Sequence, residues 1–415
     1  MNEWKPAVLG DVAIVQSGFA FKSRDWRSQG IPVVRIQNVR GGRVDLSNCL
    51  YVEPAVAEAA PRAQLARGDV LITMSGEIGS IGVVRTDDQL LLNQRVGRLS
   101  LRAGAPASLS YVLQSPKLKQ TMEVIAYGAA QPNISPSLIS SLPILLPPMH
   151  AQNKIAGFLT AIADLIEINR RRVEVLEEMA RVIYREWFVR FRYPGHEDVP
   201  LVESPLGPLP DGWAALPASD ALDINPKGQL TRGVRCRQMT MGDLDERTLN
   251  CEPGGWKDSP SGSRFQNGDT LFARITPCLE NGKTGFMQAL AQGEAACGST
   301  EFIVLRGRLV GPGFTYLLAR SDSFRGHAIS SMSGASGRQR VRNECFDSFL
   351  VATPPPAMAA KFEATIVPLF RQSWSLHQQA AALARLRDLV LPRLVTGKID
   401  VSHLDLNALT EAATA

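Results

Sequence analysis

The sequence lacks the long apolar segment that a membrane-spanning helix requires. None of its 415 residues fall in an apolar run of about 18. The start, MNEWKPAVLGDVAIV, has no basic region followed by an apolar one. A composition of 45% hydrophobic and 20% charged residues is typical of globular proteins in water. We therefore expect a cytoplasmic protein without a membrane partner, and its length indicates two or more domains.

Cysteine and histidine are too sparse and scattered to predict a metal site. The six cysteines include no C-x-x-C pair, and the five histidines complete no zinc spacing. Cysteines without such a pattern in a cytoplasmic protein are expected to be reduced thiols. The sequence predicts neither a metal nor a cofactor.

Motifs for nucleotide-dependent or methyl-transfer catalysis are also missing. There is no G-x-x-x-x-G-K-[ST] loop, no G-x-G-x-x-G, no Asn-Pro-Pro-aromatic loop and no carboxylate cluster with a lysine at nuclease spacing. One glycine-rich stretch, SGEIGSIG at 75–82, is followed by no helical pattern. We interpret it as a hairpin or a close approach of two backbones rather than a phosphate-binding loop. These absences argue against an enzyme.

Two segments carry the periodicity of a long amphipathic helix. In the first, positions spaced alternately by four and three are apolar with one exception: Ile155, Leu159, Ile162, Ile166, Asn169, Val173, Leu176, Ala180, Ile183 and Trp187. Adding 207 to the first nine of these numbers gives a second seam: Phe362, Ile366, Leu369, Ser373, Leu376, Ala380, Leu383, Arg387 and Val390. A mean spacing of about 3.5 residues is typical of coiled coils, so we expect the helices to pack on each other. The alternative is two unrelated core helices, and Pro368 should kink or open the second one.

Other motifs recur in the same order in both halves. RGDVLIT at 67–73 corresponds to NGDTLFA at 267–273, each a Gly-Asp turn before an expected strand. YVLQSPKLKQTM from Tyr111 corresponds to YLLARSDSFRGH from Tyr316, and both halves end in an apolar strand followed by prolines. A Gly-Asp turn alone is ordinary turn chemistry. The shared order, however, indicates a tandem duplication: domain, long helix, domain, long helix.

Three stretches carry a resemblance to a known family. LGDVAIVQSGFAFKS with GIPVVRIQNV lies near the start, GAAQPNISPSLISSLPILLPP precedes the first long helix, and IADLIEINRRRVEVLEEMARVIYREWFVRF runs through it. The run from a helix into REWFVRF is the most specific of the three. Together they resemble the specificity subunit of type I restriction-modification systems over essentially the whole chain. The sequence departs from the family at His150 and Ala151, where acidic residues are usual.

The resemblance implies an α+β fold class with two similar α/β target recognition domains separated by two long antiparallel coiled-coil spacer helices. The expected parts are target recognition domain 1 (1–148), a central spacer helix (149–192), a Pro- and Gly-rich linker (193–213), target recognition domain 2 (214–353), a C-terminal spacer helix (354–396) and a tail (397–415). The family's specificity subunits are not catalytic. The implied partners are double-stranded DNA with a bipartite site, two methyltransferase subunits, and endonuclease/translocase subunits.

Side chains suited to DNA occur on expected loops of both halves. Bidentate pairs from Arg, Asn and Gln to base edges specify sequence, whereas Lys and Arg on phosphates position the protein. The candidates are Lys22, Ser23, Arg35, Gln37, Asn38, Arg40, Arg43, Arg95, Gln131 and Asn133 in the first half, and Lys227, Arg232, Arg235, Arg237, Arg274, Lys283, Arg338, Arg340 and Arg342 in the second. The alternative for any one of them is a solvated surface charge. The net charge of +5 permits a polyanionic partner without requiring one.

Aromatic residues and arginines gather where the first long helix is expected to end. The aromatic members are Tyr184, Trp187, Phe188 and Phe191. Trp, Tyr and Arg are the usual anchors of protein interfaces, so we expect a subunit interface here. Packing between the helix and the following domain is an equal alternative.

Two other classes of function stay open at the level of sequence. A self-contained DNA methyltransferase or nuclease is opposed by the missing motifs. A coiled-coil scaffold that never touches nucleic acid predicts partner binding that DNA does not affect, and a salt-titrated duplex-binding assay separates it from the other functions.

Overall fold

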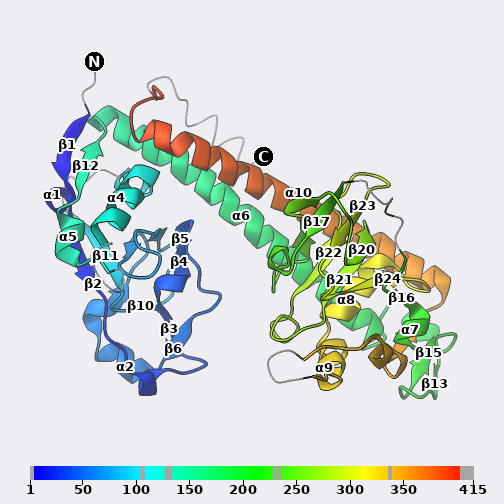
Figure 1. The fold of residues 1–415 in the computed structure, drawn as a ribbon. Coiled ribbons are helices and arrows are strands. Elements are labelled where there is room, and N and C mark those ends of the chain that lie inside the picture. Colours follow the sequence, from blue (N-terminus) through cyan, green and yellow to red (C-terminus); the bar gives the residue numbers. More distant parts are fainter. Residues whose placement is uncertain are drawn as a thin grey trace. The chain divides into compact units, whose positions relative to one another are not determined.

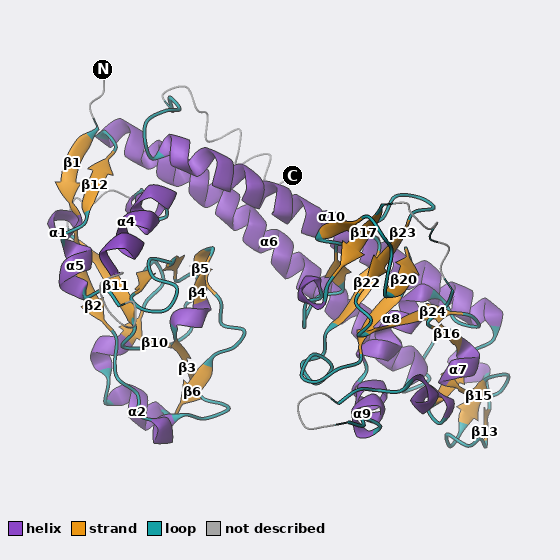
Figure 2. Ribbon diagram, viewed as in Figure 1, coloured by secondary structure: helices purple, strands orange, loops and turns teal. Residues whose placement is uncertain are grey.

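The computed structural model describes residues 4–102, 108–126, 133–227, 230, 235–334 and 339–401 (Figure 1). Two compact units make up the chain. Unit 1 comprises residues 1–165 and 382–415, and unit 2 comprises residues 166–381. Each unit mixes helices and strands, so the fold class is α+β (Figure 2). Among the described helices, none is both long enough and apolar enough to span a membrane.

Unit 1 contains a domain whose elements follow one another closely. They are β1 (Lys5–Val8), α1 (Leu9–Val12), β2 (Ala13–Ser17), β3 (Ile31–Val34), β4 (Val39–Arg40), β5 (Gly42–Val44), β6 (Leu50–Val52), α2 (Pro54–Glu58), β7 (Gln64–Leu65), β8 (Val70–Thr73), β9 (Ile81–Val83), β10 (Leu90–Leu92), β11 (Val96–Leu101), α3 (Leu109–Leu113), α4 (Pro116–Ala126), α5 (Pro136–Ser140) and β12 (Pro143–Leu146). One sheet has the strand order β2-β11-β8-β9-β5-β4 and a second β6-β3-β10-β7. Strands β8 (VLIT) and β10 (LLL) are buried along their whole length, as expected of apolar runs inside a sheet.

Unit 2 contains a second domain with the same kinds of element. They are β13 (Leu201–Val202), β14 (Leu209–Pro210), β15 (Ala214–Pro217), α7 (Ala218–Ala221), β16 (Leu222–Ile224), β17 (Cys236–Met239), β18 (Asn250–Cys251), β19 (Gly255–Lys257), β20 (Ser263–Gln266), β21 (Thr270–Ala273), β22 (Thr284–Met287), β23 (Ala295–Gly298), β24 (Phe302–Gly307), α8 (Pro312–Arg320), α9 (Asp322–Ser330) and β25 (Leu350–Thr353). Its main sheets have the orders β16-β24-β21-β22-β18 and β19-β17-β23-β20.

The strand registers of the two domains correspond residue by residue. The pairing of β1 with β12 sets Lys5 opposite Leu146, and that of β15 with β25 sets Ala214 opposite Thr353. Likewise, β11 pairs with β8 and β24 pairs with β21, both antiparallel, with Val96 opposite Thr73 and Phe302 opposite Ala273. These shared registers confirm the tandem duplication that the order of motifs predicts.

The turns interpreted from sequence are also present. Gly68 and Gly268, at the two Gly-Asp turns, have φ angles of +92° and +89°, a backbone region that favours glycine. The stretch 75–82 connects the antiparallel strands β8 and β9. A Cβ atom at Gly82 would lie 2.6 Å from the carbonyl oxygen of Arg43. The glycine-rich stretch is therefore a hairpin with a close backbone approach, as expected.

Two long helices complete the chain: α6 (Met149–Phe188) and α10 (Pro356–Leu394). In unit 1, Ile155 and Leu159 of α6 share an apolar cluster with Leu391 and Leu394 of α10. In unit 2, the other end of α6 shares a cluster with the first turns of α10, including Phe362. In unit 2, Asn169 Nδ2 lies 3.5 Å from Gln379 Oε1 and the Phe188 ring lies 4.7 Å from that of Phe362, so these two helix segments are antiparallel.

The apolar seam of α6 lies in the interior, because all ten of its positions are buried or half-buried. α10 continues through Pro368 without interruption, so the expectation that this residue opens the helix is wrong, whereas the expected kink stays a prediction. Pro368 itself is exposed, whereas Phe362, Ile366 and Phe370 are fully buried. Packing of that apolar face outweighs the loss of one backbone hydrogen bond.

Candidate nucleic-acid interface

In unit 1, one of the expected DNA-contacting side chains is interior. Asn38 is only 1% exposed, and its amide nitrogen donates to the carbonyl oxygen of Asp45 at 2.9 Å. Its side-chain oxygen accepts from the backbone N–H of Arg35 at 2.9 Å. The expectation of a base contact is wrong for this residue, because the side chain is used to close its own loop.

Two arginines on the same loop face a carboxylate. Arg40 Nη2 lies 2.6 Å from Asp45 Oδ2, and Arg43 Nη2 lies 3.8 Å from the same oxygen. Burial alone would raise the pKa of Asp45, but hydrogen bonds from Arg40 and Ser47 hold it well below its ordinary value. Arg40 is exposed and Arg43 half-buried. The cationic character of this loop is therefore partly neutralised by Asp45.

The neighbouring polar side chains bond to one backbone carbonyl. Arg35 Nη2 and Gln37 Nε2 lie 3.4 and 3.0 Å from the carbonyl oxygen of Asn48. Arg35 also lies over the ring of Trp26, 6.0 Å from its centroid. Gln37 is exposed and Arg35 is half-buried, so Gln37 is better placed to meet another molecule.

The other candidates of unit 1 are exposed. Lys22 and Ser23 stand at the start of the short 3-10 turn Ser23–Asp25. Arg95 and Asn133 are exposed and lie on either side of the segment that follows β8, because Met74 N–H donates to the carbonyl oxygen of Arg95 and Ser75 forms a β-bridge with Asn133. Gln131 lies outside the described residues.

In unit 2, the candidates near β17 differ in how far they are exposed and in whether they are held by internal bonds. Lys227 is exposed. Arg235 is exposed and lies over the ring of Trp256, 5.1 Å from its centroid. Arg237 is instead bound to Glu252 Oε1 at 3.2 Å and to the carbonyl oxygens of Ala289 and Pro253, so it is fixed in the domain. Arg232 lies outside the described residues.

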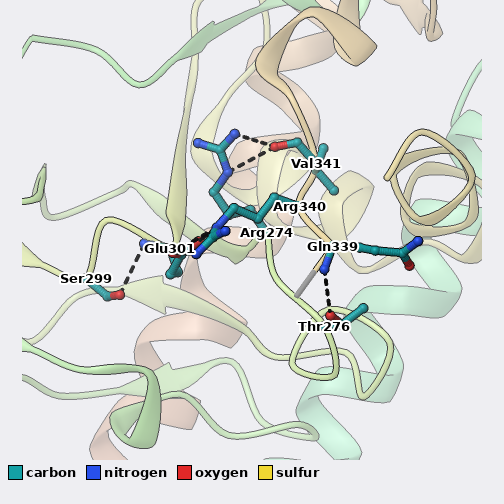
Figure 3. Close-up of polar contacts among 7 residues, drawn as sticks. All are labelled: Arg274, Thr276, Ser299, Glu301, Gln339, Arg340 and Val341. Carbon is teal, nitrogen blue, oxygen red and sulfur yellow. Dashed lines mark hydrogen bonds and ion pairs between the residues drawn. The ribbon is translucent and has the colours of Figure 1, made fainter. Parts of the chain in front are cut away.

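Arg274 and Arg340 lie near the end of β21, where Ile275 forms a β-bridge with Arg340 (Figure 3). Arg274 Nε donates to the carbonyl oxygen of Val341 at 3.0 Å. Arg340 forms a bidentate pair with Glu301, whose closest approach is 2.7 Å from Nη2 to Oε1. Lys283 donates to the carbonyl oxygen of Met241 at 3.0 Å and is half-buried, whereas Arg342 is exposed. Arg338 lies outside the described residues.

A cavity of about 610 Å³ opens beside this group. Lys227, Arg264 and Arg274 contribute its cations, Thr300 contributes a hydroxyl group, and Phe302 and Val304 contribute apolar surface. Sequence analysis missed Arg264 and Thr300, because neither lies in a motif. Only the strand pairing that sets Arg264 opposite Cys297 of β23 brings it to the same place as Lys227 and Arg274.

The aromatic residues at the end of α6 lie inside unit 2. Tyr184, Trp187 and Phe188 are 9%, 8% and 6% exposed, and Phe191 packs against the same cluster. The Phe188 ring is 4.6 Å from that of Phe314 and 4.7 Å from that of Phe362. Packing between helix and domain, the alternative left open by the sequence, describes this arrangement. These side chains offer little surface to a partner because they fill the domain's own core.

The stretch expected to be a linker also packs against this core. Tyr193 is 4% exposed and stacks on Trp213, with 5.5 Å between ring centroids. Leu209 of β14 is 1% exposed.

Metal and thiol chemistry add nothing to the site. Over the described ranges, no group of three or more His, Cys, Asp or Glu side chains lies close enough to hold a metal ion. All six cysteines are free thiols. Burial raises the pKa of Cys49, Cys251 and Cys345, so these thiols are poor nucleophiles. The described site offers hydrogen-bond donors and acceptors rather than reactive groups.

Comparison with known proteins shows that the chain is similar to specificity subunits. The family model of the type I restriction modification DNA specificity domain matches residues 1–178. The chain is 21% identical to the type I restriction enzyme MjaIX specificity subunit of Methanocaldococcus jannaschii, covering 97% of this chain and 95% of that one. It is 22% identical to the type I restriction enzyme HindI specificity subunit of Haemophilus influenzae, covering 96% of this chain and 100% of that one.

A solved structure shares the fold. The S subunit of a type-I restriction-modification system from M. genitalium aligns with a TM-score of 0.57 at 12% identity, over 95% of this chain and 96% of that one. The sequence motifs, the fold and these relatives agree in one respect: the chain is similar to the specificity subunits of type I restriction-modification systems.

Proposed function

We propose that the protein is the non-catalytic, sequence-specific DNA-binding subunit of a cytoplasmic type I restriction-modification complex. In this proposal each unit reads one half of a bipartite site on double-stranded DNA. Two methyltransferase subunits and the endonuclease/translocase subunits are directed to that site. Residues 1–148 and 214–353 act as the two target recognition domains.

The observation that carries the proposal is the cationic cavity of unit 2. Lys227, Arg264 and Arg274 line one opening together with the Thr300 hydroxyl group. Such a set suits phosphodiester groups, since Lys and Arg neutralise phosphates and a hydroxyl group donates to their oxygens. In this proposal, polar side chains next to it, including Arg340, contact the base edges.

The long helices are proposed to act as a spacer, with 149–192 and 354–396 as its two strands. The antiparallel packing of their segments in unit 2 supports this role. A coiled-coil seam resists sliding, because a shift smaller than a heptad moves polar residues inward. The stretch 193–213 and the tail 397–415 connect and end these parts.

Two other functions make different predictions. A self-contained methyltransferase or nuclease would modify DNA without any other subunit. A coiled-coil scaffold would leave DNA unbound. The cavity's cations favour a DNA-binding function over the scaffold, because a scaffold gains nothing from placing three of them in one opening.

The experiment that tests the proposal measures binding of the full chain, with any subunits that co-purify, to a library of randomised duplexes across a salt titration. We expect enrichment of a bipartite sequence and a steep loss of affinity with salt. The chain alone should transfer no methyl group from labelled S-adenosylmethionine and should not cut DNA. Binding without sequence preference, or activity of the chain alone, would contradict the proposal.

A further inference from the structure

The two units share a backbone arrangement after the equivalent strands β8 and β21 but place different side chains on it. We call this place the corner of each unit: Arg95 and Asn133 in unit 1, and Glu301 and Arg340 in unit 2. In unit 1, Met74 N–H donates to the Arg95 carbonyl oxygen at 3.0 Å, and Ile134 N–H donates to the Met74 carbonyl oxygen at 2.9 Å. In unit 2, Arg274 N–H donates to the Glu301 carbonyl oxygen at 3.0 Å, and Val341 N–H donates to the Arg274 carbonyl oxygen at 2.9 Å. The backbone frame is therefore the same in both units.

Two further pairs of contacts support this equivalence. Ser75 forms a β-bridge with Asn133, and Ile275 forms one with Arg340. Arg95 N–H is held by Asn93 Oδ1 at 3.2 Å, and Glu301 N–H by Ser299 Oγ at 3.1 Å. By these bonds Arg95 corresponds to Glu301 and Asn133 corresponds to Arg340. One frame thus carries Arg and Asn in unit 1 but Glu and Arg in unit 2.

The unit 2 corner presents a donor and an acceptor side by side (Figure 3). Arg340 Nε lies 3.0 and 2.9 Å from the two oxygens of Glu301, and Nη2 lies 2.7 Å from Oε1. Nη1 takes no part in this pair, and each carboxylate oxygen has further lone pairs. The hydrogen bond from Arg340 lowers the pKa of Glu301, which keeps the carboxyl group an acceptor. The pair can stay formed while it meets a second partner.

The contribution of the Glu301–Arg340 ion pair to folding stability is expected to be small. The Arg340 side chain is 49% exposed and that of Glu301 24% exposed. Ion pairs of this exposure contribute little to folding. The pair also lies in the segment next to the cationic cavity, since Thr300 and Arg274 line that cavity. The exposed Arg340 and the half-buried Glu301 therefore lie close to the proposed phosphate contacts.

We propose that the Glu301–Arg340 pair reads one G·C base pair in the half-site of unit 2, an inference that rests on the proposed DNA-binding function. In the major groove, guanine presents two acceptors, N7 and O6, and its cytosine partner presents the N4 amino donor beside them. Arg340 supplies donors to guanine and Glu301 supplies an acceptor to cytosine. An A·T pair offers a methyl group on thymine and a different order of donor and acceptor, so it fits this pair less well.

The test compares variants of the full chain, with any co-purifying subunits, by selection from randomised duplexes and sequencing of the bound fraction. Glu301→Gln removes the carboxylate, and Glu301→Arg with Arg340→Glu exchanges the two charges while keeping an ion pair available for folding. Asp322→Asn is the matched control. It removes an exposed carboxylate that pairs with Arg325 at 3.0 Å on α9 of the same unit.

We expect the wild-type protein to prefer G·C at one position of one half-site by about 5- to 150-fold. Both Glu301 variants should lose at least five-fold of that preference, and the control should keep it. The other half-site should be unchanged in all proteins. If Glu301→Gln lowers the melting temperature and binds no DNA, its loss of binding reflects unfolding. The base preference of the charge-exchanged variant then tests the inference, because that variant keeps an ion pair available for folding.

Three outcomes overturn the inference. The preferred sequence stays the same in the variants, or every position of both half-sites weakens together at an unchanged melting temperature, or the affected position is not G·C. In each of these the wild-type protein still binds a specific site, so the proposed function stands. A wild-type protein that selects no sequence at all overturns the proposed function itself, together with this inference.

Discussion

Glu177 of α6 accepts a hydrogen bond from the backbone N–H of Leu249 at 2.9 Å. The same carboxylate oxygen, Oε1, accepts from the Thr248 hydroxyl group at 2.7 Å. Glu177 is only 5% exposed, so a charged residue in the middle of a long helix is buried against the domain that α6 supports. The helix is thereby fixed to unit 2 by a polar contact that its apolar periodicity does not reveal.

The first prediction concerns the pH dependence of this contact. Burial raises the pKa of Glu177 above its ordinary value of 4.5, and the bonds from Thr248 and Leu249 offset only part of the rise. The folded state then holds the proton more tightly than the unfolded state, so this residue makes the free energy of unfolding fall as the pH rises from about 4.5 through the folded-state pKa. Glu177→Gln keeps Oε1 and removes the charge, so this fall should disappear.

Urea unfolding between pH 4.5 and 8 measures the effect. The Gln variant should be at least as stable as the wild-type protein at pH 8. Glu177→Ala is the control, because it leaves the Leu249 N–H without its acceptor and should cost about 1–3 kcal/mol at every pH. The same slope with pH in the wild-type and Gln proteins would show that Glu177 does not titrate in this range.

A second prediction follows from the polar position in the seam of α10. Ser373 is fully buried, and its hydroxyl oxygen accepts from Asn250 Nδ2 at 2.8 Å. In an isolated coiled coil, leucine at this position would strengthen the seam. Here Ser373→Leu should destabilise the protein by about 1–3 kcal/mol, because it overfills the site and leaves Asn250 without that acceptor.

Thermal unfolding with a double-mutant cycle measures this contact. Ser373→Ala and Asn250→Ala, separately and together, should show a coupling energy of about 0.5–3 kcal/mol. Additive losses would mean that the two residues do not stabilise each other.

The third prediction concerns the aromatic residues at the end of α6. Because Trp187 and Phe188 are buried in the core of unit 2, replacing either with alanine should cost about 3–5 kcal/mol of folding stability. Val189→Ala is a suitable control, because Val189 is 61% exposed on the same turn. Light scattering and calorimetry together give the answer. A normal melting temperature with loss of subunit assembly would instead support the subunit interface that the sequence predicts at these residues.

The sequence predicts the repeating parts of this protein well, because local periodicity and turn chemistry determine them. The alternation of four and three along α6 corresponds to buried positions, and the Gly68 turn has the backbone that glycine favours. Contacts between distant segments are not predicted in this way. Asn38 and Glu177 look like exposed polar residues in a linear sequence, yet each is buried by a partner that only the folded chain supplies.

The candidate site shows the same division. Residue type and loop position pick out many exposed cations, such as Lys227 and Arg342. They cannot show that Arg237 is held by Glu252, or that Arg264 joins the cavity from a strand edge. Whether a given cation is bound by another group of the protein depends on contacts between residues far apart in the sequence. A pattern in one short stretch of sequence carries no information about such contacts.

A fourth prediction uses the carboxylate that faces Arg40 and Arg43. Asp45→Asn removes its charge, while the Asn side-chain oxygen can still accept the bond that Ser47 N–H donates to Asp45 Oδ1 at 3.0 Å. If the two arginines contact phosphates, DNA affinity should rise at low salt, and log K should fall more steeply with log salt by about 0.9 for each added phosphate contact. Asp87→Asn, which releases Arg67 on the same domain, is the control. An unchanged salt slope in the Asp45 variant would exclude phosphate contacts for this loop.

The last prediction concerns the corner of unit 1 that corresponds to Glu301 and Arg340. Arg95 and Asn133 are both exposed there, and within the described residues Arg95 forms no ion pair. Arginine suits guanine and asparagine suits adenine, each through two hydrogen bonds. Arg95→Ala should therefore lower the base preference at one position of the half-site of unit 1 by about 5- to 150-fold and leave the half-site of unit 2 unchanged.

Arg67→Ala is the matched control, because Arg67 is a well-exposed arginine of the same domain that lies outside the corner. Sequencing of the bound duplexes separates the two possible roles of Arg95. A reader of bases changes one position, whereas a phosphate contact weakens all sequences uniformly and reduces the salt slope by about one. Changes in both half-sites at once would mean that the duplicated domains do not read DNA independently. The unit 1 and unit 2 variants together therefore test whether the same backbone arrangement recognises different bases in the two half-sites, because it carries different side chains in each unit.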